Sequence, residues 1–102
     1  MKLRVAEAAE DELVDGAAWY DEREVGLGDQ FIEEYRDAIL RIQASPGMYA
    51  RLETTRSRRN LRRCFLKRFP YYVGYELFED EIVVLAVAHT KRRPNYWIRR
   101  QG

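Results

Sequence analysis

The apolar residues in the first part of the chain recur with the period of a helix. Between residues 8 and 25, Leu13, Ala17 and Tyr20 follow one another at spacings of four and three, with Trp19 alongside. This spacing places side chains on one face of a helix, which can then pack against a core. The pattern therefore predicts a first helix over residues 8–25.

A glycine-containing segment separates this helix from a second one. Gly26-Leu27-Gly28 predicts a sharp turn, because glycine adopts the left-handed conformation that ends many helices. Asp29 follows, where an acidic side chain can cap the helix or interact favourably with its dipole. Ser45-Pro46-Gly47 predicts the end of the second helix, since proline cannot continue it. The predicted buried stripe of this helix is Phe31, Tyr35, Ala38 and Ile42, widened by Ile32 and Ile39.

Short apolar runs predict strands in the rest of the chain. Residues 3–5 favour an edge strand, and residues 61–67 and 71–78 favour two more. Residues 82–88 are all aliphatic, which is typical of a central strand covered along most of its length. Residues 49–60 lack apolar periodicity and predict a basic loop.

The predicted order of elements is β-α-α-β-β-β in one domain, residues 1–102. Short turns between the last three strands predict an antiparallel sheet, with the helical hairpin packed on one of its faces. This arrangement is an α+β fold, and it would leave the other sheet face uncovered. The aromatic side chains expected to hold the hairpin against the sheet are Trp19, Tyr20, Phe31 and Tyr35.

Charge is distributed unequally along the chain. Residues 1–47 contain five Lys and Arg against twelve Asp and Glu, a net charge of −7. Residues 48–102 contain thirteen against five, a net charge of +8, so the total of +1 conceals the asymmetry. We expect the basic half to face an anionic partner and the acidic residues to form a solvated helical surface. These acidic residues are Glu10, Asp11, Glu12, Asp15, Asp21, Glu22, Glu33, Glu34 and Asp37.

The composition is that of a globular protein, with 46% hydrophobic and 13% aromatic residues. No run approaches the roughly 20 apolar residues of a membrane span, and the N-terminal residues do not resemble a signal peptide. We therefore expect a cytoplasmic protein with no membrane partner. Cys64 is the single cysteine, so an intramolecular disulfide is excluded, and its apolar setting predicts a core position. No residue spacing predicts a metal or cofactor site.

Cations alternate with aromatic residues along the second half of the chain. Guanidinium groups bind phosphate or carboxylate through two hydrogen bonds, and aromatic rings stack on bases. We therefore expect the uncovered sheet face and the C-terminal residues to bind the target or partner. Trp97 has a second interpretation, as a residue that closes the core. The candidate binding residues are Arg62, Arg63, Lys67, Arg68, His89, Arg92, Arg93, Tyr96 and Trp97.

His89 is the only histidine and follows the most apolar predicted strand. It is either a general acid or base or a structural residue. The sequence contains no evident catalytic triad, carboxylate pair or phosphate-binding glycine loop. A ribonuclease could still use Arg, His and Tyr, because the RNA 2′-hydroxyl supplies the nucleophile and cations stabilise the transition state.

Several segments together resemble a known family. They are Trp19-Tyr20, Gly26-Leu27-Gly28 with Phe31, Arg68-Phe69-Pro70-Tyr71 with Tyr75, the run from Ile82 to His89, Arg92-Arg93-Pro94, and Tyr96-Trp97. In this order they are similar to the RelE/ParE superfamily of toxins from bacterial type II toxin–antitoxin systems. The similarity is greatest to the ParE-like branch of plasmid stabilisation proteins. It implies the β-α-α-β-β-β fold and a cognate antitoxin of the ParD or RelB type, which folds on binding and itself binds operator DNA.

The resemblance implies two alternative activities. ParE-like toxins inhibit growth by poisoning DNA gyrase, without known hydrolysis, and this is the favoured expectation. RelE-like toxins are ribosome-dependent endonucleases that cleave mRNA. For that alternative, the candidate catalytic residues are Arg63, His89, Arg92 and Tyr96.

Overall fold

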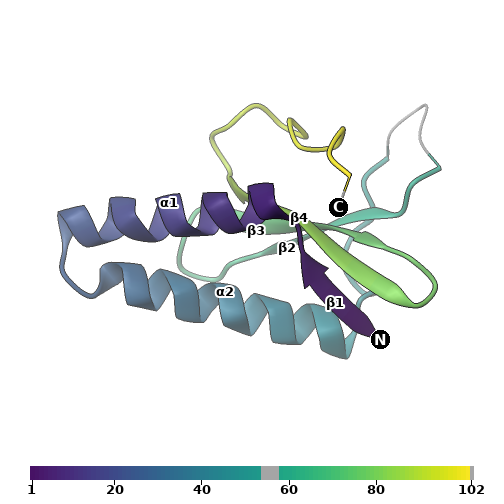
Figure 1. The fold of residues 1–102 in the computed structure, drawn as a ribbon, viewed down its shortest axis with the longest axis horizontal. Helices are drawn as coiled ribbons and strands as arrows, with labels where there is room; N and C mark the ends of the chain where they lie inside the picture. The colour runs from purple at the N-terminus through teal and green to yellow at the C-terminus, as the bar shows by residue number, and fades with distance from the viewer. Residues whose placement is uncertain (54–57, 102) are drawn as a thin grey trace.

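The computed structural model of the protein describes residues 1–53 and 58–101. Its elements follow the predicted order (Figure 1). They are β1 (Lys2–Val5), α1 (Glu7–Arg23), α2 (Leu27–Ala44), β2 (Leu61–Phe65), β3 (Tyr71–Leu77) and β4 (Glu81–His89). Residues 54–57 of the predicted basic loop lie outside the described part of the chain.

The four strands form one sheet in the order β1-β4-β3-β2. β3 pairs antiparallel with both β2 and β4, whereas β1 joins β4 in parallel, so the sheet is mixed. β4 is a central strand, and its residues from Ile82 to Ala88 are all buried. The predictions of an α+β fold, an N-terminal edge strand and a covered central strand are confirmed.

The two helices run side by side and pack on one face of the sheet (Figure 1). The buried side chains of α2 are those of the predicted stripe, Phe31, Tyr35, Ala38 and Ile42. They form one core cluster with Val73, Tyr75 and Val84 of the sheet. Removal of this apolar surface from water is the main force that holds the hairpin on the sheet.

The turn between the helices depends on two glycines. Gly26 has a φ of 90°, a left-handed conformation that side chains with a Cβ atom rarely adopt. Gly28 lies inside α2, where a Cβ atom would be 2.4 Å from the carbonyl oxygen of Ala17. α2 begins at Leu27 rather than at Asp29, so Asp29 is not the N-cap residue. It lies in the first turn, where its negative charge interacts favourably with the helix dipole.

Tyr20 packs against Phe69, with ring centroids 4.9 Å apart, and Phe31 packs against Tyr71 at 4.7 Å. Trp19 meets this cluster at its outer edge, where its ring centroid lies 5.1 Å from that of Tyr20. Half of Trp19 is exposed, and the guanidinium carbon of Arg23 lies 3.3 Å from its ring centroid. The expectation that Trp19 packs on the sheet is wrong, because it lies about 100° around the helix from Tyr20.

Two acidic residues of the hairpin are not solvated as expected. Glu34 accepts hydrogen bonds from the backbone N–H groups of Lys67 and Arg68 at 2.9 and 3.1 Å, and from Arg68 Nε at 2.9 Å. Glu12 is largely buried beneath the C-terminal residues. For these two, the prediction of a solvated face is wrong, because each carboxylate binds groups far away in the sequence. The other predicted acidic residues are exposed, namely Glu10, Asp11, Asp15, Asp21, Glu22, Glu33 and Asp37.

Because of Glu34, the free energy of unfolding is expected to change with pH in the acid range. Burial alone would raise the pKa of Glu34, but the hydrogen bonds from Arg68 and Lys67 outweigh it and lower the pKa below its usual 4.5. A lowered pKa contributes stability that is fully present above pH 4.5 and is lost as the pH falls through the folded-state value. We expect Glu34→Gln to lower the unfolding free energy by about 1–2 kcal/mol at pH 7, and by progressively less below pH 4.5.

Urea unfolding of both proteins between pH 7 and pH 3 measures this difference. Glu33→Gln is the matched control, because Glu33 is exposed and is the neighbour of Glu34. A difference between wild type and Glu34→Gln that stays constant over the whole pH range would contradict the assignment.

Candidate functional site

The sheet face opposite the helices, which we call the second face, is covered by the protein's own C-terminal segment, residues 90–101. Trp97 is fully buried against this face and contacts Gly74, where a Cβ atom would be 2.6 Å from the indole ring. The indole Nε1 donates a hydrogen bond to the Tyr72 hydroxyl at 2.8 Å. The prediction of an uncovered face is therefore wrong over β3 and β4, and the alternative interpretation of Trp97 as a core residue is correct.

The carboxylate of Glu12 in α1 binds three side chains of the C-terminal segment. It accepts hydrogen bonds from Arg100 at 2.8 and 3.2 Å and from Arg92 at 3.3 Å. It also accepts one from the Tyr96 hydroxyl. Only 14% of the Glu12 side chain is exposed, so these contacts are partly shielded from water.

The same contacts complete the open edge of β4. β1 ends at Val5, opposite Val84, so within the described residues no strand pairs with the rest of β4 on that side. Glu12 accepts the N–H of Val87 at 3.1 Å, and Arg100 donates to the carbonyl of Leu85 at 3.0 Å. The ion pair thus satisfies backbone groups that an unpaired strand edge would leave without partners.

A second set of hydrogen bonds, made by Arg59, holds the end of the C-terminal segment. Arg59 forms two hydrogen bonds with the buried carboxylate of Glu76 on β3, at 2.8 and 3.0 Å. It also donates to the carbonyls of Ile98 and Arg100. The hydrogen bonds with Glu76 raise the pKa of Arg59, so it stays charged.

These environments determine the protonation of the C-terminal side chains. Burial, together with the hydrogen bond to Glu12, raises the pKa of the Tyr96 hydroxyl far above its usual value. The hydrogen bond with Glu12 also raises the pKa of Arg100. Tyr96 therefore remains a neutral hydrogen-bond donor at physiological pH.

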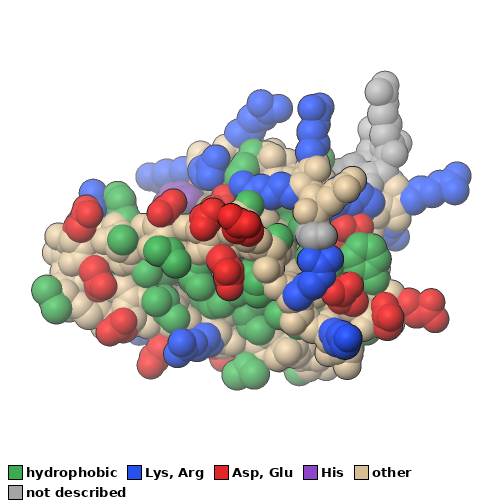
Figure 2. Space-filling view, in the orientation of Figure 1, with side chains coloured by type: hydrophobic (Ala, Val, Ile, Leu, Met, Phe, Trp, Pro, Cys, Tyr) green, Lys and Arg blue, Asp and Glu red, His purple; other side chains and the backbone are tan. Residues whose placement is uncertain are grey.

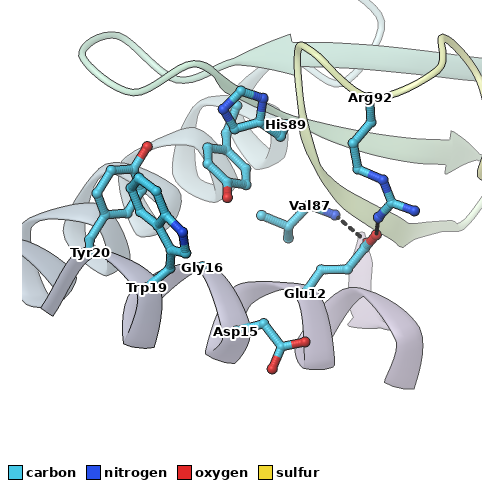
Figure 3. A pocket seen from close by; sticks show the side chains of 9 residues that line it. Glu12, Asp15, Gly16, Trp19, Tyr20, Val87, His89 and Arg92 are labelled. Carbon is cyan, nitrogen blue, oxygen red and sulfur yellow. Dashed lines mark hydrogen bonds and ion pairs between the residues drawn. The ribbon is translucent and has the colours of Figure 1, made fainter. Parts of the chain in front are cut away.

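A cleft of about 390 Å³ lies between α1 and the end of β4 (Figure 3). Trp19 and Tyr20 line one end of it, and Glu12 with Arg92 lines the other. His89 lies on the wall, and its ring centroid is 5.0 Å from that of Tyr71. Its Nδ1 accepts the backbone N–H of Lys91 at 3.0 Å, so Nε2 is the ring nitrogen left for other contacts.

The predicted binding residues on β2 point to opposite sides of the sheet. Arg62 donates to the Gly47 carbonyl at 2.9 Å and to the side chain of Asn60 at 2.9 Å, and so fixes the loop before β2. Arg63 lies on the second face, with its guanidinium carbon 5.5 Å from the Tyr72 ring centroid. The structure does not bring these two arginines together, because neighbouring strand residues alternate between faces.

The remaining candidates fall into two groups. Lys67 and Arg68 lie beside α2, where Arg68 pairs with Glu34 at 2.9 Å. His89 ends β4, directly before the C-terminal segment. The segment itself contains the other four candidates, Arg92, Arg93, Tyr96 and Trp97. Of these, Arg92 and Tyr96 share Glu12, as described above.

Cys64 occupies the core position that the sequence predicts. It is fully buried, and Arg41 Nη1 lies 3.4 Å from its sulfur. Burial raises the pKa of the thiol, against the lowering effect of the Arg41 charge. A buried thiol with a raised pKa is a poor nucleophile, so Cys64 is a packing residue.

The sequence matches the model of a family described as the ParE toxin of the type II toxin–antitoxin system parDE, over residues 3–94. The chain belongs to the ParE toxin family. It is 30% identical over 95 residues to Toxin ParE2 of two strains of Mycobacterium tuberculosis, covering 92% of this chain and 86% of the relative.

The fold of this ParE-family toxin is also similar to a solved structure, the chromosomal ParDE TA system from P. aeruginosa. The TM-score is 0.65 at 15% sequence identity, over 89% of this chain and 97% of the other. The predicted resemblance to ParE-like toxins is confirmed. The protein is a ParE-type toxin of a toxin–antitoxin system, and the family implies an antitoxin as its partner.

Among the described residues of this ParE toxin, no helix is long and apolar enough to cross a membrane. No group of three or more His, Cys, Asp or Glu side chains in residues 1–53 and 58–101 could hold a metal ion.

Sequence reasoning missed the residues that fix the C-terminal segment of this ParE toxin, namely Glu12, Arg59 and Arg100. A signal for Glu12 was present, since it lies three residues after Ala9 and four before Gly16, on the same helical face. Both of these small residues are buried. A carboxylate between two small residues on one helical face indicates a buried acid that binds a cation from another segment.

Proposed function

We propose that this ParE-type toxin inhibits growth by poisoning DNA gyrase, and that it engages its target through the C-terminal segment. Membership of the ParE family supports this proposal. The observation that carries it is the fixed C-terminal segment, which Trp97, Glu12 and Arg59 hold on the second face. A segment held in one conformation loses little conformational entropy when it binds a target.

The positions of the four candidate nuclease residues favour a toxin without nuclease activity. Arg63 contacts Tyr72 on the second face, whereas His89 contacts Tyr71 on the side of the helices. One RNA phosphate therefore cannot contact Arg63 and His89 at once, although His89 and Arg92 line the same cleft. The Tyr96 hydroxyl donates a hydrogen bond to Glu12, and its raised pKa opposes a role as a general base.

We further propose that a cognate antitoxin of the ParD type neutralises the toxin by covering its exposed cations with an acidic segment. Operator DNA is then a ligand of the antitoxin rather than of the toxin. Arg63 is a better contact for the antitoxin than Arg62, because the hydrogen bonds of Arg62 to Gly47 and Asn60 already engage its guanidinium.

Supercoiling by purified gyrase tests the proposed target. We expect the toxin to inhibit supercoiling and to increase enzyme-linked DNA breaks, and prior addition of the antitoxin should prevent both effects. A type I topoisomerase on the same plasmid is the control and should be unaffected. Normal supercoiling at excess toxin, with cleaved mRNA in a translating extract, would reject gyrase in favour of the ribosome-dependent alternative.

A further inference from the structure

The C-terminal segment carries exposed cations in addition to the arginine contacts that hold it on the sheet. We propose that Lys91, Arg92, Arg93 and Arg99 bind the phosphate backbone of duplex DNA. If gyrase is the target, as proposed above, the toxin would contact both the enzyme and the DNA that the enzyme holds. This double contact rests on the proposed function. The contact with DNA itself follows from the charge and geometry of the segment.

Three of these cations are uncommitted. The side chains of Lys91, Arg93 and Arg99 are exposed and form no ion pair within the described part of the chain. Arg92 is 56% exposed although it pairs with Glu12. Arg100 differs, because Glu12 and the Leu85 carbonyl engage its guanidinium. The segment therefore uses Arg100, and in part Arg92, for its own attachment and leaves Lys91, Arg93 and Arg99 in solvent.

The backbone that carries these cations is fixed. Trp97 anchors its middle in the core, and Arg59 holds the carbonyls of Ile98 and Arg100. Two residues before Trp97, Asn95 adopts a φ of 59°, the left-handed conformation of a tight turn. Only side-chain freedom is lost when these cations bind, and the release of counterions from DNA compensates for it.

The character of these exposed cations favours DNA as one of the two contacts of the segment, with gyrase as the other. Protein interfaces have an apolar core surrounded by polar residues. None of the exposed large hydrophobic side chains of the described chain lies in residues 90–101, because Trp97 is buried. Charge without an apolar anchor fits repeating phosphates, which require no apolar contact.

The distribution of charge also sets the direction from which DNA can approach. Figure 2 shows Lys and Arg side chains along the edge of the molecule that carries the C-terminal segment, with Asp and Glu side chains below them over α1. An acidic helix beside a basic segment repels phosphate on one side and attracts it on the other. DNA is thereby steered to the C-terminal segment.

Binding of a fluorescein-labelled 20-bp duplex to the purified toxin, followed by fluorescence anisotropy, tests the proposal. Neutralisation of about four phosphates predicts a slope of roughly −3 to −4 for log affinity against log salt. This slope corresponds to an affinity loss of about 100-fold between 50 and 200 mM salt. The variant Lys91→Gln/Arg93→Gln/Arg99→Gln should leave one contact and a slope of about −1.

The matched control is Lys2→Gln/Arg23→Gln/Arg36→Gln, which removes the same charge from exposed residues of β1, α1 and α2. It should bind the duplex with the wild-type slope. Thermal unfolding by circular dichroism verifies that both variants fold. A wild-type slope near zero, or equal weakening by the two variants, would overturn the proposal.

The same proteins in the gyrase assay separate this proposal from the proposed function. We expect the C-terminal triple variant to require at least about tenfold more protein than wild type for the same inhibition, in line with its weaker DNA contact. Inhibition by wild type without salt-dependent duplex binding would reject the DNA contact and retain gyrase as the target. Duplex binding with the expected slope, but no inhibition of gyrase, would reject the target and retain the DNA contact.

Discussion

Replacement of Trp97 by alanine is expected to lower the free energy of unfolding by about 3–5 kcal/mol. The indole is fully buried on the second face, against Gly74 of β3. Its Nε1 donates a hydrogen bond to the Tyr72 hydroxyl. Alanine would leave a large cavity and a hydroxyl without its partner, so the C-terminal segment would lose its anchor. Urea unfolding measures the loss, and limited proteolysis should cleave the segment faster than in wild type.

Trp19→Ala is the matched control for this prediction. Trp19 is half exposed and contacts Arg23 and the edge of Tyr20, so its removal should lower the unfolding free energy by only about 1 kcal/mol. Equal destabilisation by the two substitutions would show that Trp97 does not have the anchoring role that its burial indicates.

Glu12→Gln is expected to lower the free energy of unfolding by about 2–3 kcal/mol. Glutamine keeps the size of the side chain but removes the charge, so Arg92 and Arg100 lose their anionic partner. Its side-chain oxygen also cannot accept both the Tyr96 hydroxyl and the Val87 N–H as the two carboxylate oxygens do. Urea unfolding gives the energy, and hydrogen exchange should show faster exchange at Val87.

Glu10→Gln, an exposed substitution on the same helix, is the control and should be within about 0.5 kcal/mol of wild type. If Glu12→Gln left the exchange of the Val87 amide unchanged, the carboxylate would not protect the edge of β4. The assignment of Glu12 as the link between α1 and the C-terminal segment would then be wrong.

The parts of the fold that the sequence predicted have a local periodic signal. The stripe of α2 repeats every three or four residues, and each of its members is buried in the core. The aliphatic run of β4 has no polar interruption, so a central position was the consistent interpretation. Glycine and proline marked the turns because their backbone chemistry is local.

The contacts of the C-terminal segment were harder to predict because the residues that make them are distant in the sequence. Glu12 and Arg100 are 88 residues apart, and no periodic pattern links them. The sequence around an acidic residue on a helix does not show whether its carboxylate faces solvent or binds an arginine. For this reason Glu34 was wrongly predicted to be solvated. Residues 90–101 form no helix or strand, and their position on the second face depends on the side chains of Trp97, Glu12 and Arg59.

The parallel pairing of β1 with β4 has a consequence for the synthesis of this toxin. Of the four strands of the sheet, β1 is synthesised first and its neighbour β4 last. A growing chain can form the helical hairpin from local contacts, whereas the sheet must wait for the closure of a long loop. A message truncated before the codons for β4 thus yields a chain with no central strand and no clamped C-terminal segment. Folded toxin is therefore a product of complete translation, and unfinished chains are expected to be harmless to the cell.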